Sequence, residues 1–136
     1  MAQRNLDAEW LRERGLRATP ARLAMLGRLR ERAEPLSLAD LRESLPGREA
    51  ASTAYRMVRD FQRAGILRSV PSAKGLYELS DLPHHHHLIC VRCGSLEDIV
   101  SCGVEAVAER AVKRSRRFAK SVGHALEVFA VCKSCK

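Results

Sequence analysis

The chain has 136 residues and a formal net charge of +8, with 24 lysine and arginine side chains against 16 acidic ones. No apolar run approaches the roughly 20 residues that a membrane-spanning helix needs, and the first ten residues lack the apolar stretch of a secretory signal. We therefore expect a soluble cytoplasmic protein with one medium domain or two small ones. The basic balance favours an anionic partner such as nucleic acid.

The beginning of the sequence predicts a series of short helices. Residues 6–14 form the first, and a glycine ends it. Thr19, which is followed by proline, begins the next as an N-cap and first-turn pair. Ser37 and Asp40 resemble a capping box, so we expect another helix that begins there and ends at Pro46.

The segment from Ser52 predicts a further helix that ends at Gly65, and residues 66–70 and 76–79 predict two strands joined by a turn. Three helices followed by a hairpin are the order of a winged helix-turn-helix, whose third helix enters the major groove of DNA. Its arginines would contact phosphates or base edges. The alternative is a helical domain with ordinary surface arginines. The candidate DNA-contacting residues of this helix are Ser52, Thr53, Tyr55, Arg56 and Arg59.

Pro83 marks the predicted boundary between a winged-helix domain, residues 1–82, and a domain rich in cysteine and histidine, residues 83–136. Either part is near the lower size limit for a self-sufficient core, so a bound metal or a dimer interface would help to stabilise it. The second domain is predicted to be a small α+β unit. Its predicted elements are short strands at 88–90 and 96–100, a helix at 104–112 and an alternating strand at 124–132.

All five cysteines follow residue 89, and four of them form two Cys-x-x-Cys pairs. In a chain without a secretory signal, this pattern favours a metal site over disulfides. Two such turns complete a tetrahedral zinc shell, which leaves no open position for catalysis and therefore has a structural role. The alternatives are two independent redox dithiols or a stray surface pair. The predicted structural zinc ligands are Cys90, Cys93, Cys132 and Cys135.

Four consecutive histidines, residues 84–87, offer ligands to two further centres. If this segment is extended, its side chains alternate between two faces. The first centre would take His84, His86, Glu105 and His124. Such a set suits Zn²⁺, Fe²⁺ or Ni²⁺. The second centre would take Glu78, His85 and His87. The alternative is a polar linker that binds metal only adventitiously.

These motifs, taken together and in this order, resemble those of the ferric uptake regulator family. The matching stretches cover nearly the whole chain: 15–22, 52–56, 64–67, 77–79, 84–94, 124–128 and 132–135. The resemblance implies a homodimer with winged-helix heads, a shared dimerisation domain and a structural zinc at the four paired cysteines. It also implies a regulatory site at the hinge, to which Glu78, His85 and His87 correspond. The other histidine group corresponds to a second site in the dimerisation domain.

In proteins of this kind, bound metal fixes the heads so that both recognition helices meet a palindromic operator in double-stranded DNA, and transcription is repressed. The resemblance implies that Tyr55 and Arg56 face the bases, and Arg17 in the first matching stretch is a further candidate DNA contact. The expected regulatory metal is Zn²⁺ or Fe²⁺, with Mn²⁺ as a third option. No catalytic residue is expected.

Departures from the family pattern bear on the metal and the signal. Pro35 stands where iron and peroxide sensors often place a histidine, so the hinge site lacks that ligand or uses Glu34 or another group instead. His86 stands where iron sensors often carry aspartate, which favours zinc. Asp98 falls where peroxide sensors place a carboxylate ligand, which keeps peroxide sensing as an alternative. Cys102 has no assigned role and is a small apolar residue, an alternative ligand or a redox thiol.

Two alternatives from other functional classes remain at the level of the sequence. A metal centre of histidines and glutamate with an open position could serve a hydrolase, but no spaced motif such as His-Glu-x-x-His and no nucleophile paired with a base is found. A metal-storage module without a DNA target is the other alternative. The predicted winged helix argues against it.

Overall fold

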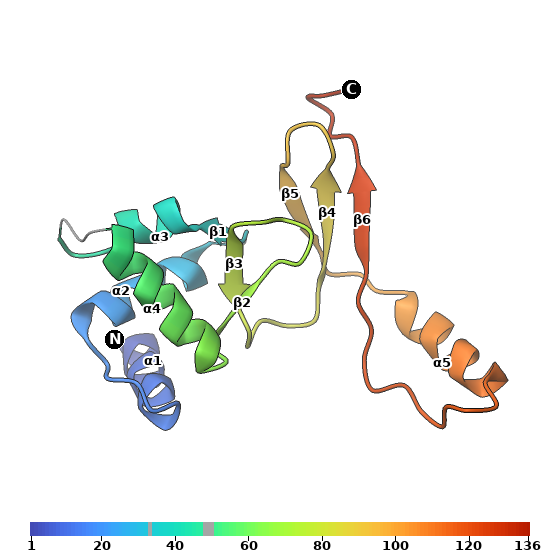
Figure 1. Ribbon diagram of the computed structural model, residues 1–136, viewed down its shortest axis with the longest axis horizontal. Coiled ribbons are helices and arrows are strands. Elements are labelled where there is room, and N and C mark those ends of the chain that lie inside the picture. The colour runs from blue at the N-terminus through green and yellow to red at the C-terminus, as the bar shows by residue number, and fades with distance from the viewer. Residues whose placement is uncertain (33, 48–50) are drawn as a thin grey trace. The chain divides into compact units, whose positions relative to one another are not determined.

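The structure, a computed structural model, describes residues 1–32, 34–47 and 51–136. The chain divides into two compact units, Met1–Leu82 and Pro83–Lys136, and each is described by itself. None of the helices among the described residues is long and apolar enough to cross a membrane. The elements of the first unit are α1 (Ala2–Glu13), α2 (Pro20–Glu31), β1 (Leu36–Ser37), α3 (Leu38–Glu43), α4 (Ala51–Arg63), β2 (Leu67–Ser69) and β3 (Leu76–Leu79) (Figure 1).

Local signals in the sequence begin and end these helices. The hydroxyl of Thr19 accepts a hydrogen bond from the backbone N–H of Arg22 at the start of α2, and the predicted capping box between Ser37 and Asp40 is present at α3. Gly65 follows α4 with a φ of +71°, a left-handed conformation that favours glycine. The predicted caps of α2 and α3 and the glycine after α4 are confirmed. Helix α1 begins four residues earlier than the pattern predicted, and the prediction that Ser52 caps the next helix is wrong, because Ser52 lies within α4.

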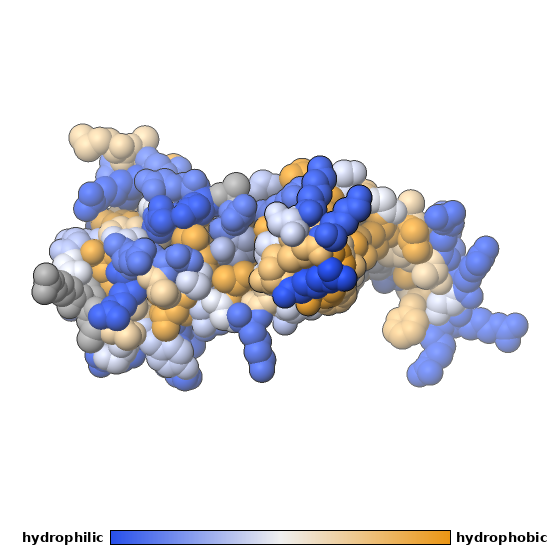
Figure 2. Space-filling model, turned by 90° about the horizontal axis from the view of Figure 1, so that it is seen from above, coloured by the Kyte–Doolittle hydropathy of each residue, from blue (hydrophilic) through white to orange (hydrophobic). Residues whose placement is uncertain are grey.

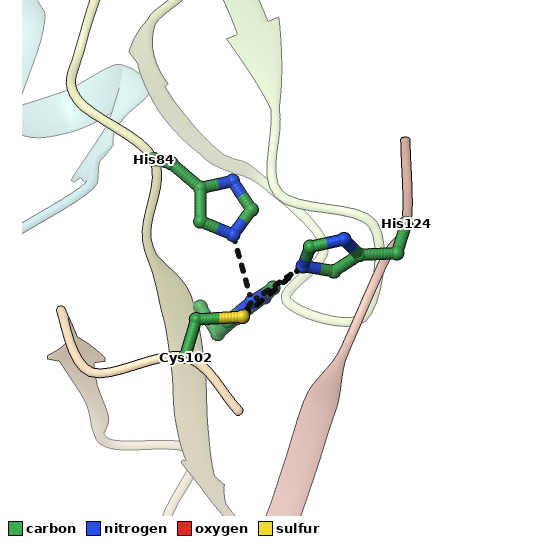
Figure 3. A group of neighbouring side chains, drawn as sticks. His84, Cys102 and His124 are labelled. Atoms are coloured by element: carbon green, nitrogen blue, oxygen red, sulfur yellow. Dashed lines mark hydrogen bonds between the residues drawn. The ribbon is translucent and has the colours of Figure 1, made fainter. Parts of the chain in front are cut away.

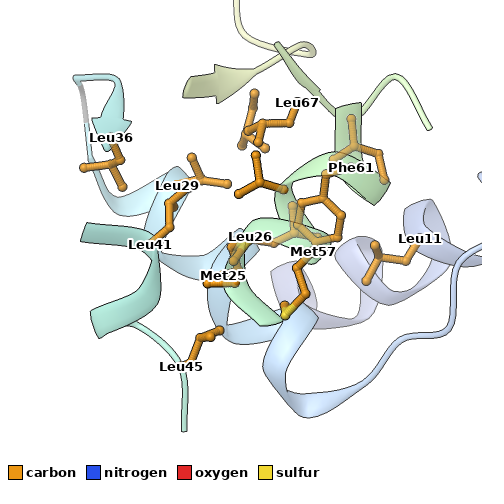
Figure 4. Packing of buried hydrophobic residues seen from close by; sticks show 14 residues of the cluster. Leu11, Met25, Leu26, Leu29, Leu36, Leu41, Leu45, Met57, Phe61 and Leu67 are labelled. Carbon is orange, nitrogen blue, oxygen red and sulfur yellow. The ribbon is translucent and has the colours of Figure 1, made fainter. Parts of the chain in front are cut away.

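One hydrophobic core unites the helices of the first unit with all three strands of its sheet (Figure 4). Helix α4 is amphipathic: it buries Ala54, Met57, Val58 and Phe61 and leaves its opposite face to solvent. Leu11 of α1 and Met25 and Leu26 of α2 are fully buried in the same core. The core therefore fixes which face of α4 is available for binding.

The sheet of the first unit has the antiparallel order β1-β3-β2. Strands β2 and β3 form the predicted hairpin, whose turn contains Gly75 at a φ of +79°. Together with α2, α3 and α4 the sheet makes a winged helix, which α1 precedes (Figure 1). The sequence did not predict β1, because two residues carry no alternation and become a strand only by pairing with β3.

A partly buried ion pair joins α1 to α2. Asp7 is 3% exposed and accepts a hydrogen bond of 2.7 Å from Nε of Arg30, which also donates to Asp81 at 3.0 Å. Burial lowers the pKa of Arg30, but the two carboxylates outweigh it and the net shift is upward. This guanidinium therefore stays charged and compensates the buried Asp7 carboxylate.

Replacement of Arg30 by alanine is expected to lower the free energy of unfolding of the first unit by about 3 kcal/mol. This is the lower end of the range for breaking a buried pair, because the Arg30 side chain is 25% exposed. Urea denaturation followed by circular dichroism measures the change. Arg12→Ala in α1 is the control, since Arg12 is exposed; equal effects of the two variants would contradict this account.

The second unit is a small three-stranded sheet with one helix. Its elements are β4 (His86–Cys90), β5 (Leu96–Ile99), α5 (Val104–Arg114) and β6 (Glu127–Ala130). The sheet order is β5-β4-β6, with β4 antiparallel to β5 and parallel to β6 (Figure 1). A parallel pair needs a long crossover, and residues 91–126, which contain β5 and α5, supply it.

The second unit buries little apolar surface. Ile89 and Cys90 are its buried hydrophobic residues, and no residue of α5 is buried. Large apolar side chains are instead exposed among charged ones, as the right-hand part of Figure 2 shows. The exposed large apolar residues of the second unit include Val107, Phe118, Val122, Phe129 and Val131. A unit of this kind needs further stabilisation.

Candidate metal centres and nucleic-acid interface

The four paired cysteines come together at one end of the second sheet. Cys90 ends β4, and Cys132 follows β6, so the parallel pairing of the two strands places both pairs side by side. The four sulfur atoms lie within 4.8 Å of one another, and Sγ of Cys93 is 3.7 Å from Sγ of Cys132. A tetrahedral zinc with bonds of about 2.3 Å requires sulfur separations of about 3.8 Å. The group therefore fits a zinc ion.

The pKa values of two of these thiols are shifted in opposite directions, as expected for a group that binds a cation. Backbone N–H groups, with that of Cys132 first, lower the pKa of Cys90 to about 6. Hydrogen bonding with the neighbouring thiols of Cys132 and Cys93 raises the pKa of Cys135 to about 12. The Cys90 thiol therefore ionises more readily than an ordinary thiol, but four thiolates this close together would repel one another. A divalent cation removes this conflict by replacing the protons.

A second group of ligand atoms comes from three separate segments (Figure 3). Nε2 of His86, in β4, is 3.1 Å from Nε2 of His84 and 3.3 Å from Nε2 of His124. Sγ of Cys102 lies 3.1 Å from Nε2 of His86 and 3.2 Å from Nε2 of His124. Burial and the neighbouring histidines lower the pKa of His86, which favours the neutral imidazole that binds metal.

Glu105 lies outside this ligand group, although the spacing had placed it there. Its side chain is exposed in the first turn of α5. Cys102 occupies the fourth place, because the loop before α5 passes the end of β4. Glu105 and His124 do line one surface pocket, together with Glu109 and Lys113.

A third group uses the other face of the histidine segment. His85, His87 and Asp98 offer ligand atoms within 4.8 Å of one another. Asp98 is the cross-strand partner of His87 in the β4–β5 pairing, and the His87 Nε2 to Asp98 Oδ1 distance is 3.5 Å. The predicted alternation of the histidines is therefore present: His84 and His86 face one group, and His85 and His87 face the other.

Glu78, the remaining predicted ligand, lies in β3 of the first unit. It is 3% exposed, and Nε of Arg68 in β2 donates a hydrogen bond of 2.8 Å to its Oε1. Continued by one residue, the register that pairs Leu36 with Tyr77 brings Pro35 opposite Glu78. Pro35, where the resemblance led us to look for a histidine ligand, is thus opposite Glu78, and its side chain offers no ligand atom.

The exposed face of α4 carries the candidate DNA contacts. Ser52, Tyr55, Arg56 and Arg59 are exposed, and Thr53 is half-buried. The guanidinium of Arg59 lies over the Tyr55 ring, 5.8 Å from its centroid, which restrains both side chains. The remaining candidate, Arg17, is exposed before α2. The described face thus presents arginines and an aromatic side chain on a helix of a winged-helix unit.

Comparison with known proteins identifies the family. The model of the ferric uptake regulator family matches residues 13–129. The chain belongs to this family. A ferric uptake regulation protein of Neisseria gonorrhoeae is 33% identical over 132 residues, which cover 93% of this chain and 90% of that protein.

Solved structures of ferric uptake regulator relatives share the fold. A zinc-bound manganese uptake regulator is 30% identical with a TM-score of 0.71, and the match covers 91% of this chain and 96% of that one. A zinc uptake regulator complexed with zinc and DNA is 25% identical with a TM-score of 0.57, and the match covers 98% of this chain and 93% of that one. The winged helix and the small zinc-compatible sheet are thus the architecture of the family.

The sequence offers an alternative metal ligand as one of three roles for Cys102 but does not say which residues would join it, and it points to Asp98 only through the family pattern. The signal for Asp98 was present, because an antiparallel strand after a Cys-x-x-Cys turn brings it opposite His87. No local signal pointed to Cys102, which lies between β5 and α5 and meets His86 and His124 only through the fold.

Proposed function

We propose that this protein is a metal-responsive transcriptional repressor that binds a palindromic operator as a homodimer when its regulatory site holds a divalent metal. The observation that carries the proposal is the position of the histidine segment. The segment begins immediately after Pro83, the first residue of the second unit, and its histidines supply ligand atoms to two separate groups. The same chain presents exposed arginines on α4. A metal centre at this boundary is suited to control a DNA-binding unit.

We propose that the hinge site combines His85, His87 and Asp98 with Glu78 of the first unit. A shell drawn from both units is complete in one arrangement only, so metal favours that arrangement. To change the competent fraction from about 1% to 99%, the metal must bind that state more tightly by about 5.5 kcal/mol. Operator DNA must in turn tighten metal binding by the same factor.

The homodimer is supported by the apolar surface of the second unit. Phe118 is 70% exposed, Val122 is 91% exposed and Phe129 is 59% exposed. Association of two copies through this unit would bury such side chains, and it would relate two α4 helices by a two-fold axis. A palindromic operator has the same symmetry.

The ligand types indicate which metal each site would bind. The four paired cysteines would hold a structural Zn²⁺, and the regulatory sites would take Zn²⁺ or Fe²⁺, with Mn²⁺ as a third option. The four-cysteine zinc shell has no open position for a substrate, so that site serves structure rather than turnover.

Metal titration of operator binding tests the proposal. Protein that retains its structural zinc and is otherwise metal-free is titrated separately with Zn²⁺, Fe²⁺ and Mn²⁺, while fluorescence anisotropy follows a labelled operator from its own promoter. We expect at least a tenfold increase in affinity with one metal, two chains for each operator and a steep loss of affinity with salt. If no metal changes the affinity, or if metal-free protein binds equally well, the proposal is wrong.

Peroxide sensing is a second candidate signal, because Asp98 shares a ligand group with His85 and His87. Iron bound beside oxidisable histidines would make operator binding sensitive to peroxide. Loss of binding after peroxide treatment of the Fe²⁺-loaded protein, with no loss in the Zn²⁺-loaded protein, would support this candidate. Equal resistance of both forms would eliminate it.

A further inference from the structure

The loop between β5 and α5 brings a thiol to the centre of three histidines. Cys102 lies on this loop, and its sulfur is within 3.2 Å of Nε2 of both His86 and His124 (Figure 3). The two contacts link segments that are 16 and 22 residues away in the sequence. A thiol in ordinary apolar packing has no reason to face imidazole nitrogens on two sides.

The separations fit a tetrahedral metal shell. Bonds of about 2.0–2.1 Å to nitrogen and 2.3 Å to sulfur require N···N separations of about 3.3 Å and N···S separations of about 3.6 Å. The observed N···N separations are 3.1 and 3.3 Å, and the N···S separations are 3.1 and 3.2 Å. The sulfur would have to move outward by only a few tenths of an ångström to admit an ion.

We propose that Cys102, as a thiolate, is the fourth ligand of the site formed by His84, His86 and His124, in the place where the spacing had suggested Glu105. Binding converts the Cys102 thiol and a divalent ion into a sulfur–metal bond and releases one proton to solvent. A thiolate with three imidazoles favours Zn²⁺ over Mn²⁺, which prefers oxygen ligands. A role for this ligand in regulation rests on the proposed function, whereas the identity of the four ligands can be tested without DNA.

Cobalt(II) is the probe, because a thiolate bound to Co²⁺ gives a charge-transfer band in the near ultraviolet and imidazoles and carboxylates do not. Co²⁺ is titrated into protein whose structural zinc is retained, and zinc content is measured before and after to show that no exchange occurred. The variants are Cys102→Ser and the matched control Glu105→Gln. The group of His85, His87 and Asp98 contains no thiol and contributes no such band.

We expect the band in the wild type to saturate at one equivalent of Co²⁺ per site and to be absent in Cys102→Ser. We expect Glu105→Gln to keep it. In competition experiments Cys102→Ser should reduce the preference for Zn²⁺ over Mn²⁺ at least about tenfold, since even residues outside the ligand shell change metal affinity by that much. A band that persists in Cys102→Ser, or one that disappears in Glu105→Gln, overturns the assignment.

The outcomes separate this inference from the proposed function. If the thiolate band forms but no metal changes operator affinity, the ligand assignment stands and the repressor proposal fails. If metal controls operator affinity and the wild type binds Co²⁺ without a thiolate band, the repressor proposal stands and the Cys102 assignment is wrong.

Discussion

The double substitution Cys132→Ser and Cys135→Ser is expected to abolish retention of the structural zinc and to unfold the second unit, Pro83–Lys136. This unit buries only Ile89 and Cys90 as apolar residues, so its core cannot compensate for the loss. The cysteine site also closes the long crossover that joins β4 to its parallel neighbour β6. Structural zinc sites in small domains contribute about 10–16 kcal/mol at neutral pH, which is comparable to the whole stability of a typical domain, about 5–15 kcal/mol.

Zinc content by elemental analysis and thermal unfolding by calorimetry measure this effect. We expect the first unit to unfold as before, because its core cluster lies entirely within Met1–Leu82. Ser134→Ala is the control, since Ser134 is exposed between the two replaced cysteines and belongs to none of the metal-ligand groups; its replacement should leave the structural zinc bound. If the double variant, stripped of metal from its histidine sites as the wild type is, still retains one zinc and shows an unchanged second transition, the structural role of the cysteine site is refuted.

Replacement of Arg56 by alanine is expected to give the largest loss of operator affinity among substitutions that leave the fold intact. Arg56 is exposed on α4, whose opposite face is anchored by Met57, Val58 and Phe61 in the core. A bidentate contact between arginine and a base is worth about 1–3 kcal/mol. A homodimer makes each contact twice, so the expected loss is about 2–6 kcal/mol, or about 30-fold and more.

Anisotropy titrations of the metal-loaded protein at two salt concentrations test this expectation. Arg110→Ala is the control for charge, because Arg110 is exposed on α5 in the second unit. Arg59→Ala provides a contrast: if Arg59 contacts phosphate, its loss should weaken binding to all sequences and reduce the salt dependence. Should Arg56→Ala behave like Arg110→Ala, the arginines of α4 are ordinary surface residues and another element reads the operator.

The sequence by itself determined the features that depend on neighbouring residues. The N-cap of α2, the capping box of α3 and the glycine after α4 were predicted because each satisfies backbone groups within one turn. The two Cys-x-x-Cys turns and the alternating histidines were also predicted from local sequence, because a short turn or an extended strand fixes the direction in which adjacent side chains point. The family followed from the order of these local motifs.

Only the tertiary structure decided which distant residues share a site. Strand β1 exists because β3 pairs with it, and Cys102 meets His86 and His124 because the loop before α5 passes both of them. Glu105 is three residues beyond Cys102, yet the start of α5 turns it to solvent while the preceding loop carries the thiol to His86. Which residue of the crossover reaches the histidines depends on how the crossover packs against the sheet, and the spacing of residues along the sequence does not determine that packing.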